Sequence, residues 1–154
     1  MSKEALNIEG LGKKVIEQFW DLNLIREPSD IFKLNFDKIK NLEGWGELSI
    51  KNLKGAISKS KSISLERFIF SIGIRHIGQE NAKVIAAFFI SIKEFSQLFI
   101  KNKRDHILKN LAELDGIGET HVDSIKNFFS DKINSKITQN MINHLYICLL
   151  YTSQ

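Results

Sequence analysis

A short glycine pattern recurs four times in this chain, and glycines spaced in this way can bind an anion through the protein backbone. Each copy begins with an apolar residue, carries another one before its last glycine and precedes a run with helical spacing. The third copy has His76 where the others have their first glycine. Because the last glycines recur about every 35 residues, the pattern is an internal repeat. The copies lie at residues 8–12, 42–46, 74–78 and 114–118.

The pattern is typical of a tight turn between two helices, the helix-hairpin-helix motif. Such a turn needs a positive φ, which glycine adopts without a Cβ clash, and valine at either Gly12 or Gly118 is therefore expected to strain it. The helix that follows begins with unpaired N–H groups at the positive end of its dipole. A phosphate oxygen binds there without any particular side chain. The motif therefore predicts DNA binding that is independent of base sequence and sensitive to salt.

A single copy is explained equally well by a helix C-cap followed by a new helix. Four copies that share apolar residues four and seven positions after the last glycine favour the phosphate-binding interpretation. The third copy, with His76, is expected either to hold phosphate less well or to serve packing alone. The backbone donors predicted from the pattern are Gly10, Gly12, Gly44, Gly46, Gly78, Gly116 and Gly118, and the side chains expected to add positive charge are Lys13, Lys14, Lys51, Arg75 and Lys83.

Composition limits the class of protein. The chain has 154 residues, 43% of them hydrophobic and 26% charged, as in an ordinary globular protein with one core or two small ones. The formal net charge of +4 suits a polyanionic partner. Lysines follow the second copy with no acid between Glu47 and Glu66. A solvated helix face explains this run as well as DNA contact does, and its place after a hairpin favours DNA.

Several other sites and locations are not expected. Cys148 is the only cysteine, so neither a disulfide framework nor a cysteine-based metal site is predicted. The four histidines are scattered without an i, i+4 pair, and we predict no metal site. No apolar run approaches the roughly 18 residues of a membrane span. The polar N-terminus is not a signal peptide. We therefore expect a cytoplasmic monomer.

The apolar spacing is helical nearly throughout, and no stretch shows the sustained alternation of a strand, so we predict an all-α fold. Hairpins commonly pack in pairs, which predicts two pseudo-symmetric halves, 2–62 with repeats one and two and 63–130 with repeats three and four. Residues 131–154 are expected to form a C-terminal helix and a tail that is partly non-native or docks on a missing neighbour. The predicted helices are 13–22, two short ones within 30–42, 47–60, 65–72, 79–89, 93–99, 105–114, 119–129 and 135–150.

The segments around the repeats resemble the helix-hairpin-helix domain of bacterial NAD-dependent DNA ligase. Residues 73–78 are the most specific part, because the third hairpin of that family has the same Arg-His form, so His76 is a feature of the family. The resemblance extends over about 2–129. It also rests on residues 5–12 with Lys14 and Ile16, on 24–25, 30–32, 42–47, 49, 52–53 and 60–61, and on 114–118.

The resemblance implies a domain that holds a duplex from the minor-groove side while another part of the ligase seals the nick, in replication and repair. The family's adenylation motif, Lys-x-Asp-Gly, is absent, since Glu113 stands where its lysine would have to be before Asp115 and Gly116. Its four-cysteine zinc module and BRCT domain are also absent. We therefore expect no catalytic residue in this chain, and expect NAD, magnesium and zinc to belong to other parts of the ligase. The expected partners are duplex or nicked DNA and those remaining domains.

The sequence departs from the family in one respect. The family often has a basic residue two positions after the last hairpin glycine, where this chain has Lys14, Leu48, Glu80 and Thr120. We therefore expect weaker phosphate affinity at the second and fourth hairpins. Two other functions remain open, a hairpin module of another DNA-repair or junction-binding protein and a helical protein–protein adaptor. A hairpin-containing glycosylase is excluded, because it needs a Gly-Pro segment and Pro28 is the only proline.

Overall fold

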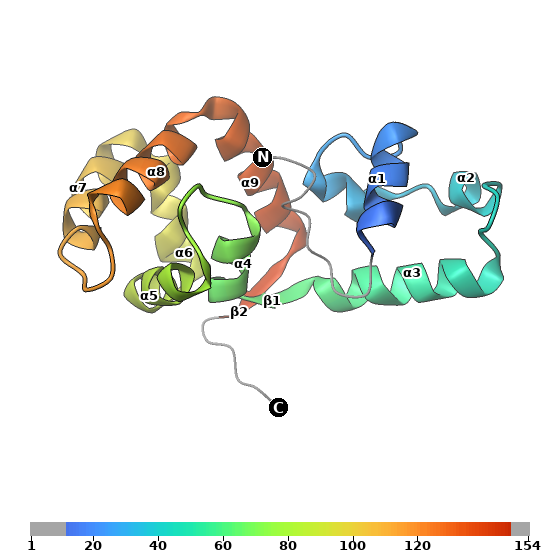
Figure 1. The fold of residues 1–154 in the computed structure, drawn as a ribbon, viewed down its shortest axis with the longest axis horizontal. Coiled ribbons are helices and arrows are strands. Elements are labelled where there is room, and N and C mark those ends of the chain that lie inside the picture. The colour runs from blue at the N-terminus through green and yellow to red at the C-terminus, as the bar shows by residue number, and fades with distance from the viewer. Residues whose placement is uncertain (1–11, 149–154) are drawn as a thin grey trace.

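The computed structural model describes residues 12–148, and the regular secondary structure of this range is almost entirely helical (Figure 1). Two short strands, β1 (Ser62–Ser64) and β2 (Tyr146–Cys148), are the exceptions within this range. The predicted all-α class is confirmed apart from these strands. The helices are α1 (Lys13–Asp21), η2 (Pro28–Lys33), α2 (Phe36–Lys40), α3 (Glu47–Ser60), α4 (Leu65–Ser71), α5 (Gln79–Phe89), α6 (Ile92–Phe95), η3 (Ser96–Phe99), α7 (Lys101–Leu111), α8 (Glu119–Ser130) and α9 (Lys132–His144).

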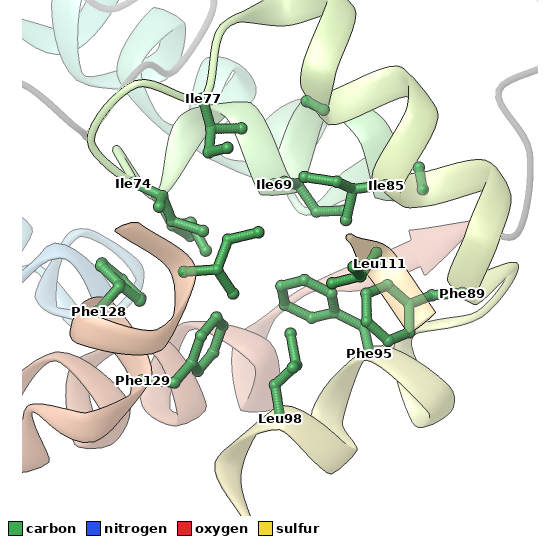
Figure 2. Packing of buried hydrophobic residues seen from close by; sticks show 14 of the residues in the cluster. Ile69, Ile74, Ile77, Ile85, Phe89, Phe95, Leu98, Leu111, Phe128 and Phe129 are labelled. Atoms are coloured by element: carbon green, nitrogen blue, oxygen red, sulfur yellow. The ribbon is translucent and has the colours of Figure 1, made fainter. Parts of the chain in front are cut away.

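The buried apolar side chains of residues 12–148 form two separate clusters. The first, which we name the N-core, gathers residues 16–57 from α1, η2, α2 and α3. The second and larger one, the C-core, has its fully enclosed members in residues 65–129. At its centre the ring of Phe95 meets Phe89 and Phe129 edge-on, with centroids 5.3 and 5.6 Å apart (Figure 2). Such edge-to-face pairs are favourable beyond the apolar area they bury. The division into halves 2–62 and 63–130 stays a prediction.

The repeated apolar positions attach the hairpin helices to these cores. Seven residues after the last glycine of each copy stand Phe19, Leu53, Ile85 and Ile125, and all four are buried. Two of them belong to the N-core and two to the C-core. Since seven residues make almost two turns of helix, each of these side chains lies on the same face of its helix as the glycine. Packing against the cores therefore determines the orientation of each helix that follows a hairpin.

The C-terminal prediction was wrong in its details. A helix was expected over 135–150, whereas α9 begins at Lys132 because the side chain of Asp131 accepts hydrogen bonds from the backbone N–H groups of Ile133 and Asn134. After α9 the chain becomes extended and forms β2, which pairs in parallel with β1. A strand of three residues is too short to show alternation, so the sequence pattern could not reveal it.

The start of α7 also differs from the prediction. This helix was expected to begin at Asp105. Instead, Ile100 has an extended conformation, and its carbonyl accepts a hydrogen bond from the N–H of Arg104 at 2.8 Å. The helix therefore begins at Lys101 and ends at Leu111. No side-chain cap marks this start. Without a cap the sequence carried no local signal for it.

Ile90 lies in a strained turn at the end of α5. Its φ of 69° and ψ of −48°, together with a 2.8 Å hydrogen bond from the N–H of Ser91 to the carbonyl of Phe89, define a γ-turn of the strained kind. A β-branched residue rarely adopts a positive φ. The Ile90 side chain is 59% exposed, so burial does not compensate for this strain.

Replacing Ile90 by glycine is therefore expected to raise the free energy of unfolding by about 1 kcal/mol. The change removes a backbone strain of about 1–3 kcal/mol and adds roughly 0.5–1 kcal/mol of unfolded-state entropy. Urea unfolding followed by circular dichroism measures the difference. Ile100→Gly is the matched control, since Ile100 is also exposed but has a φ of −98° and should gain nothing. If the Ile90→Gly protein is less stable than the parent, the backbone at Ile90 is not strained.

Candidate nucleic-acid interface

Three of the four glycine patterns lie wholly within the described residues, and they form the same turn. In each, the N–H before the last glycine donates to the carbonyl three residues earlier, at 3.1 to 3.2 Å. The residue directly before this N–H has a positive φ, which is 86° at Gly44, 68° at His76 and 88° at Gly116. His76 therefore preserves the turn despite its Cβ. Of the first copy only Gly12 can be placed, because Gly10 lies outside the described residues.

The last glycine of each pattern is the residue that precedes a helix. Gly12, Gly46, Gly78 and Gly118 have φ values of −69°, −130°, −89° and −103°. These values are open to any residue, so the expected strain from valine at Gly12 or Gly118 was wrong. In the three copies that lie wholly within the described residues, the positive φ belongs to Gly44, His76 and Gly116, two positions before the last glycine. A Cβ at Gly12, Gly46 or Gly78 would meet nothing within 4 Å among the described residues. The missing side chain therefore leaves the start of the following helix open.

The backbone N–H groups of these glycines are not equivalent. The N–H of Gly78 donates to Oδ1 of Asn81 at 3.3 Å, and that of Gly118 donates to Nδ1 of His121 at 2.9 Å. In the part of the chain that the structure describes, the N–H of Gly46 has no such side-chain acceptor. The same holds for Gly12 within this part. Asn81 and His121 were missed, although a polar residue three positions after a helix-capping residue is a known capping signal.

The third and fourth hairpins are joined directly. Nδ2 of Asn81, in the first turn of α5, donates to the carbonyl of Gly116 at 3.1 Å. Asn81 thus contacts the backbone of both hairpins at once. The α2–α3 connection, which contains Gly44 and Gly46, lies at one end of the long axis of the molecule, and α5 and α8, which follow hairpins three and four, lie in the other half (Figure 1). The structure therefore brings hairpins three and four together and keeps the second one apart.

The predicted basic residues are all exposed. Lys13 and Lys14 lie in the first turn of α1, Arg75 lies in the third hairpin, and Lys83 lies on α5. Each is on a hairpin or within two turns of one. Their contact with DNA, like that of the hairpin glycines, stays a prediction.

Lys51 lines a groove of about 340 Å³ between α2 and α3, beside the second hairpin. Lys40 and Lys54 also line it, and Nζ of Lys54 lies 4.9 Å from the centroid of the Phe36 ring. The carboxylates of Asp37 and Glu47 partly offset this positive charge. Lys40 was missed as a candidate, because only the packing of α2 against α3 places it near Lys51.

No group of three or more His, Cys, Asp or Glu side chains between residues 12 and 148 could hold a metal ion. Over the same residues, no helix is both long enough and apolar enough to cross a membrane.

The chain is similar to a known family and to several DNA ligases. Residues 67–138 match the helix-hairpin-helix motif family. The chain is 50% identical over 147 residues to a DNA ligase of Pelagibacter ubique, an alignment that covers 96% of this chain and 21% of that protein. It is 41% identical over 155 residues to a DNA ligase of Rickettsia bellii, with 96% and 22% covered. It is 41% identical over 142 residues to a DNA ligase of Francisella tularensis subsp. novicida, with 92% and 20% covered.

These matches confirm the predicted resemblance to the helix-hairpin-helix part of a DNA ligase, and the NAD-dependent type stays a prediction. The chain spans about a fifth of the length of the relatives it matches. The third and fourth hairpins lie within the residues that match the helix-hairpin-helix motif. Over nearly its whole length the chain is therefore similar to one segment of DNA ligases, and its residues 67–138 match the helix-hairpin-helix motif.

Proposed function

We propose that this chain is the part of an NAD-dependent DNA ligase that binds duplex DNA through its hairpins, without preference for base sequence. Two observations together support the proposal. The chain is similar to DNA ligases, and its hairpins share one turn geometry. Each turn is followed by a helix that begins after a glycine, so the residue before the helix has no side chain to cover the helix start. Such a helix start offers N–H donors and the positive end of a dipole to a phosphate oxygen. Phosphates are the same at every base pair, so these contacts carry no sequence information.

The hairpins should contribute unequally to the affinity for DNA. At Gly12 and Gly46 the N–H group has no side-chain acceptor among residues 12–148 and is ready for a phosphate oxygen, whereas at Gly78 and Gly118 a side-chain acceptor must first be displaced. Exposed lysines and arginine around the hairpins add charge that attracts the polyanion. The second hairpin lies at one end of the molecule, and the third and fourth lie in the other half (Figure 1). We therefore propose that these hairpins contact separate phosphates of one duplex.

The remaining steps of the ligase reaction belong to other parts of the same protein. The chain lacks the lysine on which adenylation would occur, with Glu113 at its place, so this segment positions DNA and does not transfer a group to it. NAD, magnesium and zinc act in those other parts. The segment works as a monomer in the bacterial cytoplasm, during replication and repair.

The isolated chain is expected to bind two unrelated duplexes, nicked or intact, with equal affinity. The logarithm of the association constant should fall linearly with the logarithm of the salt concentration, with a slope of about −0.9 for each phosphate neutralised. Fluorescence anisotropy at several salt concentrations measures this slope. A marked preference for one duplex, or an affinity that does not respond to salt, would exclude phosphate binding by the hairpins and favour a protein–protein adaptor.

A further inference from the structure

The two cores are joined by a short stretch of backbone. α3 ends at Ser60 on the N-core side, and α4 begins at Leu65 on the C-core side, with β1 between them. Two units on such a connection move relative to each other unless further contacts hold them. Their relative position matters here, because the second hairpin belongs to one unit and the third and fourth belong to the other.

The helix α9 provides the first of these further contacts. It packs against α8 of the C-core and also against η2 of the N-core. Nδ2 of Asn140 donates to Oε1 of Glu27 at 2.7 Å, across 113 positions of sequence. The same carboxylate oxygen accepts from Oγ of Ser29 at 2.8 Å, and Ser29 is fully buried. Hydrogen bonds to an ionised acceptor are roughly twice as strong as neutral ones.

An aromatic contact lies at the end of the same helix. The ring of His144 stacks on the ring of Phe32 in η2, with centroids 5.7 Å apart and planes at 8°. Nζ of Lys61, the residue that follows α3, is 6.0 Å from the centroid of that Phe32 ring. Three segments that are distant in sequence therefore meet at Phe32.

The strand β2 then binds the connection itself. It pairs in parallel with β1, with Ile147 opposite Ile63, and both side chains pack against the C-core. The N–H of Tyr146 donates to the carbonyl of Lys61 at 2.6 Å. The backbone that joins the two cores is thereby paired along its length with the end of the described chain.

We propose that residues 132–148, which we name the brace, hold the N-core and the C-core in one orientation, so that the second hairpin and the third and fourth contact the same duplex together. The DNA part of this proposal rests on the proposed function, whereas the structural part does not. Contacts held at a fixed spacing strengthen one another, because once the first forms the others are intramolecular and have a high effective concentration.

The structural part is tested by measuring the distance between the cores. In a Cys148→Ser background, Lys38 in α2 and Lys109 in α7, both exposed, are replaced by cysteine and spin-labelled. The Asn140→Ala/His144→Ala variant removes the hydrogen bond to Glu27 and the ring contact with Phe32. Gln139→Ala/Asn143→Ala is the matched control, since it truncates two exposed side chains of the same helix. Pulsed electron spin resonance should show a narrow distance distribution for the parent and the control and a broader one for the brace variant. An unchanged distribution would overturn the proposal.

The DNA part is tested with two duplex lengths, about 24 and about 8 base pairs, or roughly 80 and 27 Å at 3.4 Å per step. The brace variant should bind the long duplex at least about tenfold more weakly than the control and the short duplex about equally well. A broadened distance distribution with unchanged long-duplex affinity would overturn the role in DNA binding. If the parent binds neither duplex, the proposed function fails, and the distance measurement still decides whether the brace holds the cores.

A second variant guards against loss of folding. If circular dichroism shows that the double variant is unfolded, Asn140→Asp is measured in its place. This change puts a second carboxylate beside Glu27 while keeping the His144–Phe32 contact, so repulsion at neutral pH should separate the cores without removing apolar packing. A narrow distribution in a folded Asn140→Asp protein would overturn the proposal in the same way.

Discussion

Valine at Gly12 or at Gly46 is expected to weaken duplex-DNA binding by at least about tenfold each, or about 1.4 kcal/mol, whereas valine at Gly118 is expected to cost less than about threefold. At Gly12 and Gly46 the added side chain would occupy open space at a helix start, where a phosphate is proposed to bind. The N–H of Gly118 is already bonded to His121 at 2.9 Å, so less affinity depends on it. Anisotropy titrations at one salt concentration compare the three variants.

The three glycines separate two explanations. Lys14 stands two positions after Gly12, but Leu48 and Thr120 stand at that place after Gly46 and Gly118. If the basic residue decides affinity, Gly46→Val will behave like Gly118→Val. If affinity depends on a backbone N–H group that has no side-chain acceptor, Gly46→Val will behave like Gly12→Val. This is the result we expect.

Folding is not expected to obscure this comparison. The backbone at Gly12, Gly46 and Gly118 has angles that valine adopts, and the cost of a poorer helix cap is about 1 kcal/mol for each variant. Gly55→Ala is a control within α3, because Gly55 is exposed and a Cβ there meets nothing within 4 Å. It should stabilise the helix slightly and leave DNA affinity unchanged. If all three valine variants are folded and bind like the parent, the hairpins are only structural turns.

Replacement of Arg104 by alanine is expected to lower the free energy of unfolding by about 3 kcal/mol. The Arg104 side chain is only 7% exposed. Its Nε donates to the carbonyl of Leu98 at 2.8 Å, its Nη1 to Oγ of Ser130 at 3.0 Å and its Nη2 to the carbonyl of Phe99 at 3.4 Å. Arg104 therefore ties η3 to α8 around the C-core, and its loss leaves these acceptors without the donor that pairs them. Urea unfolding measures the change.

Lys103 is the matched control for Arg104. It is the preceding residue of the same helix and is exposed, so Lys103→Ala should change the free energy of unfolding by less than about 0.5 kcal/mol. Arg104→Lys should recover little, because an ammonium group does not reproduce the planar fork of donors. Equal stability of the Arg104→Ala and Lys103→Ala proteins would show that the buried contacts of Arg104 contribute nothing.

The sequence by itself determined the hairpins and the helices that follow them. The bounds predicted for α3 and α5 agree with the structure, Glu47–Ser60 and Gln79–Phe89. Both helices start directly after a hairpin glycine and keep their apolar spacing, so the signals for turn, start and core-facing side are all local. α7 lacks such a start signal, and there the predicted bounds were wrong.

The sequence could not decide what each hairpin does within the fold. It showed His76 in place of a glycine, but only the structure shows that this histidine has a φ of 68° and keeps the turn. It showed basic residues without showing which are buried. Arg104 follows two lysines in a polar run, and only the packing of η3 and α8 around it makes it a buried residue.

Tertiary structure alone decided how the hairpins are placed relative to one another. The contact between Asn81 and Gly116 joins residues 35 positions apart, and that between Asn140 and Glu27 joins residues 113 positions apart. Such contacts form only after separate helices have packed, and one polar side chain at each end leaves no periodic trace in a sequence. The same holds for β2, since three residues become a strand only when β1 is beside them to pair with. Local periodicity therefore specifies the repeated units, and long-range packing specifies their arrangement.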